Sequence, residues 1–249
     1  MAGIPFPKRK VSRAIALKEL DLLAAAYPNA VTALSFRSPY ELLVAVILSA
    51  QCTDARVNLT TPTLFEAYPN ATALARANLE DVERIVKSCG FFRMKAKNII
   101  AAARVLVEEH DGEVPQDRAA LEALPGVGRK TASVVLSVIF EEAAFAVDTH
   151  VFRVARRLGL TTGRTPLAVE RDVTALLACE QWRHAHHWLI LHGRAVCKAP
   201  TPLCEVCPLA QLCPSADIVA RTKAVRARRG AVGAAARHRV RSASAAKRR

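Results

Sequence analysis

Apolar residues recur at intervals of three and four positions along most of this chain, and that spacing predicts amphipathic helices. No stretch alternates apolar and polar residues in the way that indicates a half-buried strand. Glycine, proline and asparagine separate the periodic segments, which favours short connections in a compact all-α protein. The predicted helices span residues 13–26, 39–50, 54–67, 79–88, 94–110, 117–124, 129–141, 148–158, 166–178 and 182–194.

The longest apolar runs, residues 42–48 and 134–140, are much shorter than the roughly 20 residues that a membrane span requires. No apolar segment with a cleavage site follows the basic N-terminal residues, so we expect no secretory signal. We therefore expect a cytoplasmic protein without a membrane partner. In that compartment the cysteines are reduced thiols or metal ligands.

The formal net charge of +14 is concentrated at the two ends of the 249-residue chain. Residues 1–14 hold four basic and no acidic residues, and residues 215–249 hold eleven basic residues and a single acid. Neither end carries enough large apolar residues to form a core, so we expect both ends to be disordered. Such ends add salt-sensitive attraction to phosphates, which favours DNA as the partner.

Four cysteines near the C-terminus follow the pattern C-x6-C-x2-C-x5-C within seventeen residues. Prolines lie between and beside them, so the segment is predicted to be a rigid loop that gathers the sulfurs around a metal. The spacing is compatible with a tetrahedral zinc and with a [4Fe–4S] cluster, because both accept four thiolates. Cys52, Cys89 and Cys179 are instead predicted to be small core residues on helical faces. The four candidate ligands are Cys197, Cys204, Cys207 and Cys213.

A sharp break at residues 124–130 separates two predicted helices. Asp117 is expected to cap the first of these helices, and the proline that follows is expected to end it. Gly126 and Gly128 permit a tight backbone turn. The second helix then starts near Arg129 with its first amides facing outward, and such a helix-hairpin-helix can hold a DNA phosphate.

Lys130 falls in the first turn of that second helix. The positive end of the helix dipole and the adjacent Arg129 both disfavour an ammonium, so we expect a lowered pKa for Lys130. A neutral lysine amine is a nucleophile that forms Schiff bases, and the sugar C1′ of a nucleotide losing its base is a suitable target. The alternative is a lysine that only pairs with phosphate. Asp148 opens another helix, where it can act as an N-cap or assist proton transfer.

These features, in this order, closely resemble the endonuclease III family of DNA glycosylases, over about residues 15–214. The resemblance implies an all-α, two-lobed helix-hairpin-helix glycosylase fold. A six-helix barrel would span residues 32–142, and an iron-sulfur cluster lobe would combine residues 15–31 with 143–214. The basic ends, 1–14 and 215–249, fall outside it. Further motifs that carry the resemblance are Leu48-Ser49-Ala50-Gln51, Gly112-Glu113-Val114-Pro115, Val147-Asp148-Thr149-His150 and the run from His187 to Arg194.

The same resemblance implies a bifunctional glycosylase and AP lyase that acts as a monomer on duplex DNA containing oxidised pyrimidines or abasic sites. Lys130 would displace the base and form a Schiff base at C1′ in a cleft whose other wall carries Asp148, and β-elimination would nick the strand. The four-cysteine loop would hold a structural [4Fe–4S] cluster. Phe91 departs from the family, where leucine is common. Residues expected to contact DNA are Gln51, Phe91, Gly126, Val127, Gly128, Arg129 and Lys198.

Two other functions remain open at this point. Monofunctional adenine or mismatch glycosylases of the same superfamily keep the aspartate and the cysteines, but they lack a lysine at the position of Lys130. The adenine-specific enzymes typically add a C-terminal recognition domain, which the Ala/Arg-rich tail does not resemble. A non-catalytic DNA-binding protein with a zinc or iron-sulfur site would bind DNA without cutting it, and its binding would not depend on Lys130.

Overall fold

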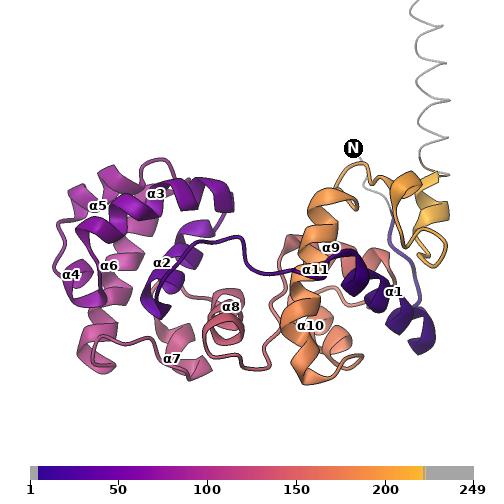
Figure 1. Ribbon diagram of the computed structural model, residues 1–249, viewed down its shortest axis with the longest axis horizontal. Coiled ribbons are helices and arrows are strands. Elements are labelled where there is room, and N and C mark those ends of the chain that lie inside the picture. The colour runs from indigo at the N-terminus through magenta and orange to yellow at the C-terminus, as the bar shows by residue number, and fades with distance from the viewer. Residues whose placement is uncertain (1–4, 221, 223–249) are drawn as a thin grey trace, which may run out of the picture. The chain divides into compact units, whose positions relative to one another are not determined.

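The computed structural model describes residues 5–220 and 222, and within them every regular element is a helix. The predicted all-α class is therefore confirmed. No helix of this described part is long and apolar enough to cross a membrane. The elements, labelled in Figure 1, are α1 (Arg13–Ala26), α2 (Pro39–Ser49), α3 (Asp54–Ala67), α4 (Ala71–Ala75), α5 (Leu79–Val86), α6 (Phe92–Glu109), α7 (Arg118–Ala123), α8 (Arg129–Ile139), α9 (Thr149–Arg157), α10 (Pro166–Thr174), η1 (Cys179–Gln181), α11 (Trp182–Ala195) and η2 (Cys204–Val206).

Each of the ten predicted helices is present, with ends that differ from the prediction by a few residues. Helix α4 was not predicted, because its five residues are too few to show a period. Hydroxyl, amide and carboxylate side chains set most of the helix starts by accepting a backbone N–H in the first turn. Asp117 caps α7 in this way, as predicted, with 2.8 Å between its Oδ1 and the amide of Ala120. The other such caps are Ser12, Ser38, Thr53, Asn70, Asn78 and Thr165.

The helices group into two compact units. Among the described residues, the hairpin unit contains 28–148 and 177–188, and the cysteine unit contains 5–27, 149–176, 189–220 and 222. Residues 177–188, which the family resemblance assigns to the cluster lobe, thus lie with the hairpin unit. Helix α11 contributes residues to both units.

Helix α2 is the centre of the hairpin unit. All of its residues from Tyr40 to Leu48 are buried, because α3, α6 and α8 pack around the helix. Apolar residues on all sides of the helix are consistent with this enclosure. The Tyr40 hydroxyl donates to the carbonyl of Tyr68 at 3.0 Å, so the one phenol in this helix has a partner. Because α2 is enclosed, the loop that follows it has a rigid support.

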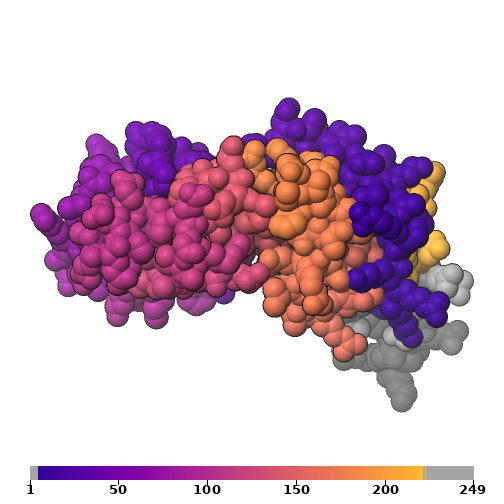
Figure 2. Space-filling model, turned by 90° about the horizontal axis from the view of Figure 1, so that it is seen from below, coloured from indigo at the N-terminus to yellow at the C-terminus, as the bar shows by residue number. Residues whose placement is uncertain are grey.

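The N-terminal segment is anchored to the cysteine unit. Lys10 forms an ion pair with Asp172 at 2.6 Å, and the amide of Val11 donates to the carbonyl of Gly159 at 3.0 Å. The guanidinium of Arg156 lies 3.9 Å from the ring centre of Phe6. Figure 2 shows the N-terminal part of the chain, in indigo, lying against residues drawn in orange. Residues 5–14 therefore have an ordered path and residues 216–220 are helical, where composition alone favoured disorder, whereas residues 1–4, 221 and 223–249 lie outside the described residues.

Candidate functional site

The hairpin joins α7 to α8 through a turn that requires one of its two glycines. Gly126 has a φ of 82°, and a Cβ placed there would lie 2.9 Å from both Cβ and Nδ2 of Asn98 on α6. Only glycine fits such a position without strain. The side chain of Val127 is buried and its amide donates to the carbonyl of Leu124 at 3.0 Å, which closes the turn. Gly128 is different, because a Cβ there would meet nothing within 4 Å.

Lys130 is exposed in the first turn of α8. The N-cap of this helix is Gly128, which has no side chain to bond the first-turn amides. The helix therefore presents its positive end together with two cations, Arg129 and Lys130, at one surface position. That combination suits a phosphate, and it places a lysine amine beside the phosphate site.

The segment before Asp148 is held by α11. The ring of Phe145 is buried and packs edge-on against His186, with 6.1 Å between the ring centres. Nδ1 of His186 lies 2.7 Å from the carbonyl oxygen of Ala146, and since a carbonyl only accepts, Nδ1 carries the proton. Asp148, two residues later, is half-buried and belongs to the same hairpin unit as Lys130. The sequence offered no signal for the positioning contact made by His186.

Two exposed side chains with left-handed backbones lie on neighbouring loops. Gln51, between α2 and α3, has a φ of 52°, and Phe91, at the start of α6, has a φ of 57°. The carbonyl oxygen of Gln51 is 3.5 Å from the position of a Cβ on Gly90, so the two loops touch. Phe91 is 69% exposed, which excludes a place in the core. Positive φ at bulky residues is costly and is typical of functional sites.

Two arginines one turn apart on α9 hold the backbone that leads to the four-cysteine loop. Arg153 donates to the carbonyl of Gly193 at 2.9 Å and to that of Cys197 at 3.1 Å. Arg157 is 3% exposed and donates to the carbonyls of Lys198 and Ala199, each at 2.7 Å. Lys198, predicted to meet DNA, is itself exposed on this fixed backbone.

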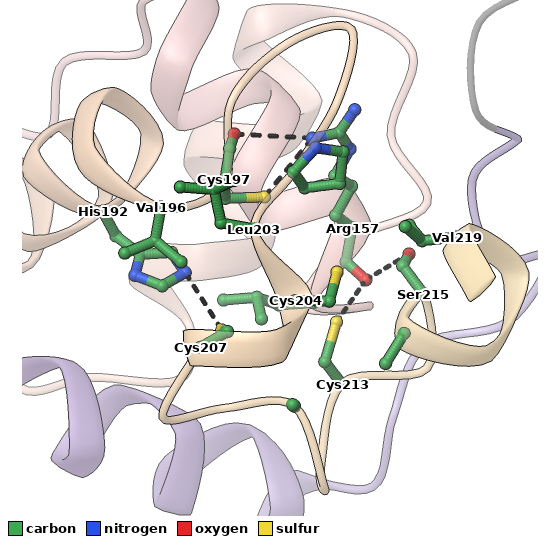
Figure 3. Close-up of a pocket in the computed structure, with 14 residues that line it drawn as sticks. Arg157, His192, Val196, Cys197, Leu203, Cys204, Cys207, Cys213, Ser215 and Val219 are labelled. Atoms are coloured by element: carbon green, nitrogen blue, oxygen red, sulfur yellow. Dashed lines mark hydrogen bonds between the residues drawn. The ribbon is translucent and has the colours of Figure 1, made fainter. Parts of the chain in front are cut away.

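The four predicted cysteine ligands line one pocket of the cysteine unit (Figure 3). Two further side chains approach the sulfurs: Nη1 of Arg157 lies 3.4 Å from Sγ of Cys197, and Nε2 of His192 lies 3.6 Å from Sγ of Cys207. Sγ of Cys213 donates to the carbonyl of Arg157 at 3.4 Å. No sequence signal pointed to these roles of His192 and Arg157.

The protonation of these groups is governed by burial. Burial raises the pKa of Cys213 to about 12 and raises that of Cys207, so both thiols stay protonated unless a metal replaces the proton. Burial lowers the pKa of His192 to about 4, which leaves its ring neutral at pH 7. Nδ1 of this neutral ring lies 3.4 Å from the Tyr27 hydroxyl and Nε2 faces the Cys207 sulfur, so one nitrogen donates and the other accepts.

Four thiols line this one pocket, and four thiolates are the donor set that both a tetrahedral zinc and a [4Fe–4S] cluster accept. The adjacent guanidinium of Arg157 would offset part of the negative charge of the thiolates.

The sequence matches a known repair family. Residues 44–179 match the HhH-GPD superfamily of base excision DNA repair proteins. The chain is 52% identical to endonuclease III of Synechocystis sp. over 189 residues, which cover 76% of this chain and 86% of that protein. It is 46% identical to endonuclease III of Escherichia coli K12 over 197 residues, which cover 79% and 93% of the two proteins.

Solved structures give the same result. A non-covalent endonuclease III–DNA complex superposes with a TM-score of 0.82 at 43% identity, covering 85% of this chain and 99% of that one. A trapped covalent endonuclease III–DNA intermediate gives 0.81 at 44% identity, covering 83% and 98%. The chain therefore belongs to the endonuclease III family, the DNA glycosylase/AP lyases of base excision repair.

Proposed function

We propose that this enzyme removes oxidised pyrimidines from duplex DNA, and that Lys130 and Asp148 carry out the reaction. The observation that carries the proposal is the position of Lys130, which is exposed in the first turn of α8 directly after the Gly126 turn. A phosphate held at this turn would bring the sugar of the same nucleotide to the lysine amine. The target must be flipped out of the duplex first, because C1′ is otherwise shielded by the stacked base.

In the first step, Nζ of Lys130 attacks C1′ while the bond from C1′ to the base breaks. The base leaves with the bonding electron pair and takes up a proton. Opening of the sugar ring then gives a Schiff base between Nζ and C1′. Loss of a proton from C2′ expels the 3′ phosphate by β-elimination, which nicks the strand.

Asp148 is assigned two tasks in this scheme. Its carboxylate stabilises the positive charge that develops at C1′ as the base departs, and it accepts the proton that Lys130 must lose. The bond between His186 and the carbonyl of Ala146 supports this assignment, since it fixes the backbone two residues before the carboxylate. His186 is thus a positioning residue.

The remaining predicted residues bind the DNA. The first-turn amides of α8, with Gly126, Gly128 and Arg129, would hold a phosphate, and Val127 would close the turn from its buried position. Gln51 and Phe91 would fill the space left by the flipped nucleotide, since both are exposed on loops that touch. Lys198 would add one phosphate contact from the cysteine loop.

Cys197, Cys204, Cys207 and Cys213 would hold the [4Fe–4S] cluster. When bound, the cluster supplies four metal–sulfur bonds that order the loop, and it takes no part in base removal. Arg157 and His192 would support it through the contacts described above. By the family resemblance we assign residues 32–142 to the barrel and residues 15–31 with 143–214 to the cluster lobe, although residues 28–31, 143–148 and 177–188 lie with the hairpin unit in the structure. We expect a monomer that acts on DNA in the cytoplasm.

The test is base release and strand cleavage on a duplex carrying one thymine glycol. Lys130→Ala should lose both activities, and Asp148→Asn should slow base release by about a hundredfold or more. Lys18→Ala, which removes an exposed cation on α1, is the matched control and should behave as the wild type. Free base with an intact strand would show a monofunctional glycosylase, and DNA binding without either product would show a non-catalytic protein.

A further inference from the structure

Two cysteines outside the cluster loop lie under the loops of Gln51 and Phe91. Cys52 directly follows Gln51 and is half-buried, and Cys89 is completely buried two residues before Phe91. The predicted core location is thus correct for Cys89, although it follows α5 instead of lying within it. It is wrong for Cys179, which is exposed, and Cys52 lies in a loop because residues 50–53 are not helical.

The two thiols are neighbours. Cys52 adds to the rise in the pKa of Cys89 that burial causes. Sγ of Cys89 also lies 3.8 Å from Oγ1 of Thr60 on α3. The backbones meet as well, since the carbonyl oxygen of Gln51 is 3.5 Å from the Cβ position of Gly90. The residues adjoining the two cysteines are therefore already in contact.

A buried lysine completes the group. Lys95 on α6 is 5% exposed and donates from Nζ to the carbonyl of Leu48 at 2.8 Å. Its charge interacts with both Cys52 and Cys89. Burial raises the pKa of Cys89, while the Thr60 hydrogen bond and the Lys95 charge act in the opposite direction. The Lys95 charge offsets only part of the rise in the Cys89 pKa, so Cys89 would react through a small thiolate fraction, and the thiolate is the nucleophile in thiol–disulfide exchange.

We propose that Cys52 and Cys89 are a redox modification site that forms a reversible disulfide with a low-molecular-weight disulfide as oxidant. The half-buried Cys52 thiolate attacks the oxidant, forms a mixed disulfide and releases one small thiolate. The Cys89 thiolate then attacks Sγ of Cys52, forms the Cys52–Cys89 bond and releases the second small thiolate. The protein pair loses two electrons and two protons, and the oxidant is reduced to two thiols.

The order of the steps follows from exposure. Cys89 cannot be reached by the oxidant from solvent, whereas Cys52 can. Cys179 is exposed but lies beside Glu180, whose hydrogen bond raises the pKa of this thiol and makes it a poorer nucleophile. Cys179 has no partner cysteine, so it can form only a mixed disulfide. Cys179 is therefore the matched control, because it is an accessible cysteine that has no second cysteine with which to form a disulfide.

The disulfide would restrain both DNA-facing loops at once, a consequence that rests on the proposed roles of Gln51 and Phe91. One end of the bond adjoins Gln51 and the other lies two residues from Phe91, and both of these residues hold left-handed backbones. Insertion into DNA requires the two loops to adjust together. We expect oxidation to slow base removal by about tenfold, an effect of the size that misplaced positioning groups produce.

The experiment treats the cluster-loaded enzyme anaerobically with oxidised glutathione and maps its peptides without reduction. Visible absorbance monitors the cluster throughout. The expected result is a peptide pair joined through Cys52 and Cys89 in the wild type and in Cys179→Ser, with none in Cys52→Ser or Cys89→Ala. Glutathione retained on Cys52, or modification of Cys179 alone, would overturn the proposal.

Activity provides the second readout. Oxidised wild type should release base about tenfold more slowly than reduced wild type, and dithiothreitol should restore the rate. Cys52→Ser should keep its rate under oxidation. If the disulfide forms and the rate of base release does not change, the inference that the disulfide restrains the two loops is wrong. A reduced enzyme with no base release would instead refute the proposed function, while the peptide map would still decide whether the disulfide forms.

Discussion

Replacing Gly126 by alanine should destabilise the hairpin unit, and the two contributions can be separated. The first is conformational, because alanine at a φ of 82° costs roughly 1–2 kcal/mol. The second is steric, because the new Cβ would lie 2.9 Å from both Cβ and Nδ2 of Asn98. Overpacking of this kind costs about 1–3 kcal/mol.

Together these terms predict a loss of about 2–5 kcal/mol in the free energy of unfolding. At roughly 2–4 °C per kcal/mol, the midpoint of thermal unfolding should fall by about 4–20 °C. The assay is urea and thermal unfolding of the cluster-loaded protein, followed by circular dichroism. Adding Asn98→Ala to Gly126→Ala should recover only part of the lost stability. It removes the contact of the new Cβ with Nδ2 of Asn98, but the contact with Cβ of residue 98 remains.

Gly128→Ala is the matched control. Gly128 has a φ of −103°, and its added Cβ meets nothing within 4 Å, so stability should change by less than about 0.5 kcal/mol. The methyl group would still project at the start of α8, where we place a phosphate. Weaker DNA binding by a normally stable Gly128→Ala protein is therefore expected. Equal destabilisation by the two substitutions would refute this account of the turn.

Two other substitutions test the cysteine unit. Glu19 is fully buried, its carboxylate oxygens have no hydrogen-bond partner, and burial raises its pKa from 4.5 to about 8. The folded state therefore binds the proton more tightly, so stability should fall by a few kcal/mol between pH 5 and 8. Urea unfolding of Glu19→Gln should show a flatter pH profile, and an unchanged profile would contradict this. Arg157→Lys keeps the charge but cannot span two loop carbonyls, so a chelator should remove iron several-fold faster than from the exposed control Arg171→Lys.

Much of the fold could be predicted from local signals. The ten longer helices follow from apolar spacing, and the start of α7 follows from Asp117. The glycine requirement in the hairpin was also visible, although only the structure shows that it applies to Gly126 and not to Gly128. These are properties of residues that are close together in the sequence, where the spacing itself carries the information.

The interactions that the sequence did not reveal join distant segments. Arg157 meets the carbonyl of Lys198 across 41 positions, and His192 meets the sulfur of Cys207 across 15. The contact between Gln51 and Gly90, which brings the loops of Cys52 and Cys89 together, likewise forms only in the folded chain. No periodicity or composition marks such pairs, because the packing of helices decides them.

The most direct measurement of the central claim is borohydride trapping on a thymine glycol duplex, followed by mapping of the modified residue. Borohydride reduces a Schiff base to a stable amine, so the account predicts a covalent adduct on Lys130. The adduct should be absent in Lys130→Ala and present in Lys18→Ala. An adduct on a different amine, or free base released without any adduct, would contradict the assignment of Lys130 as the nucleophile.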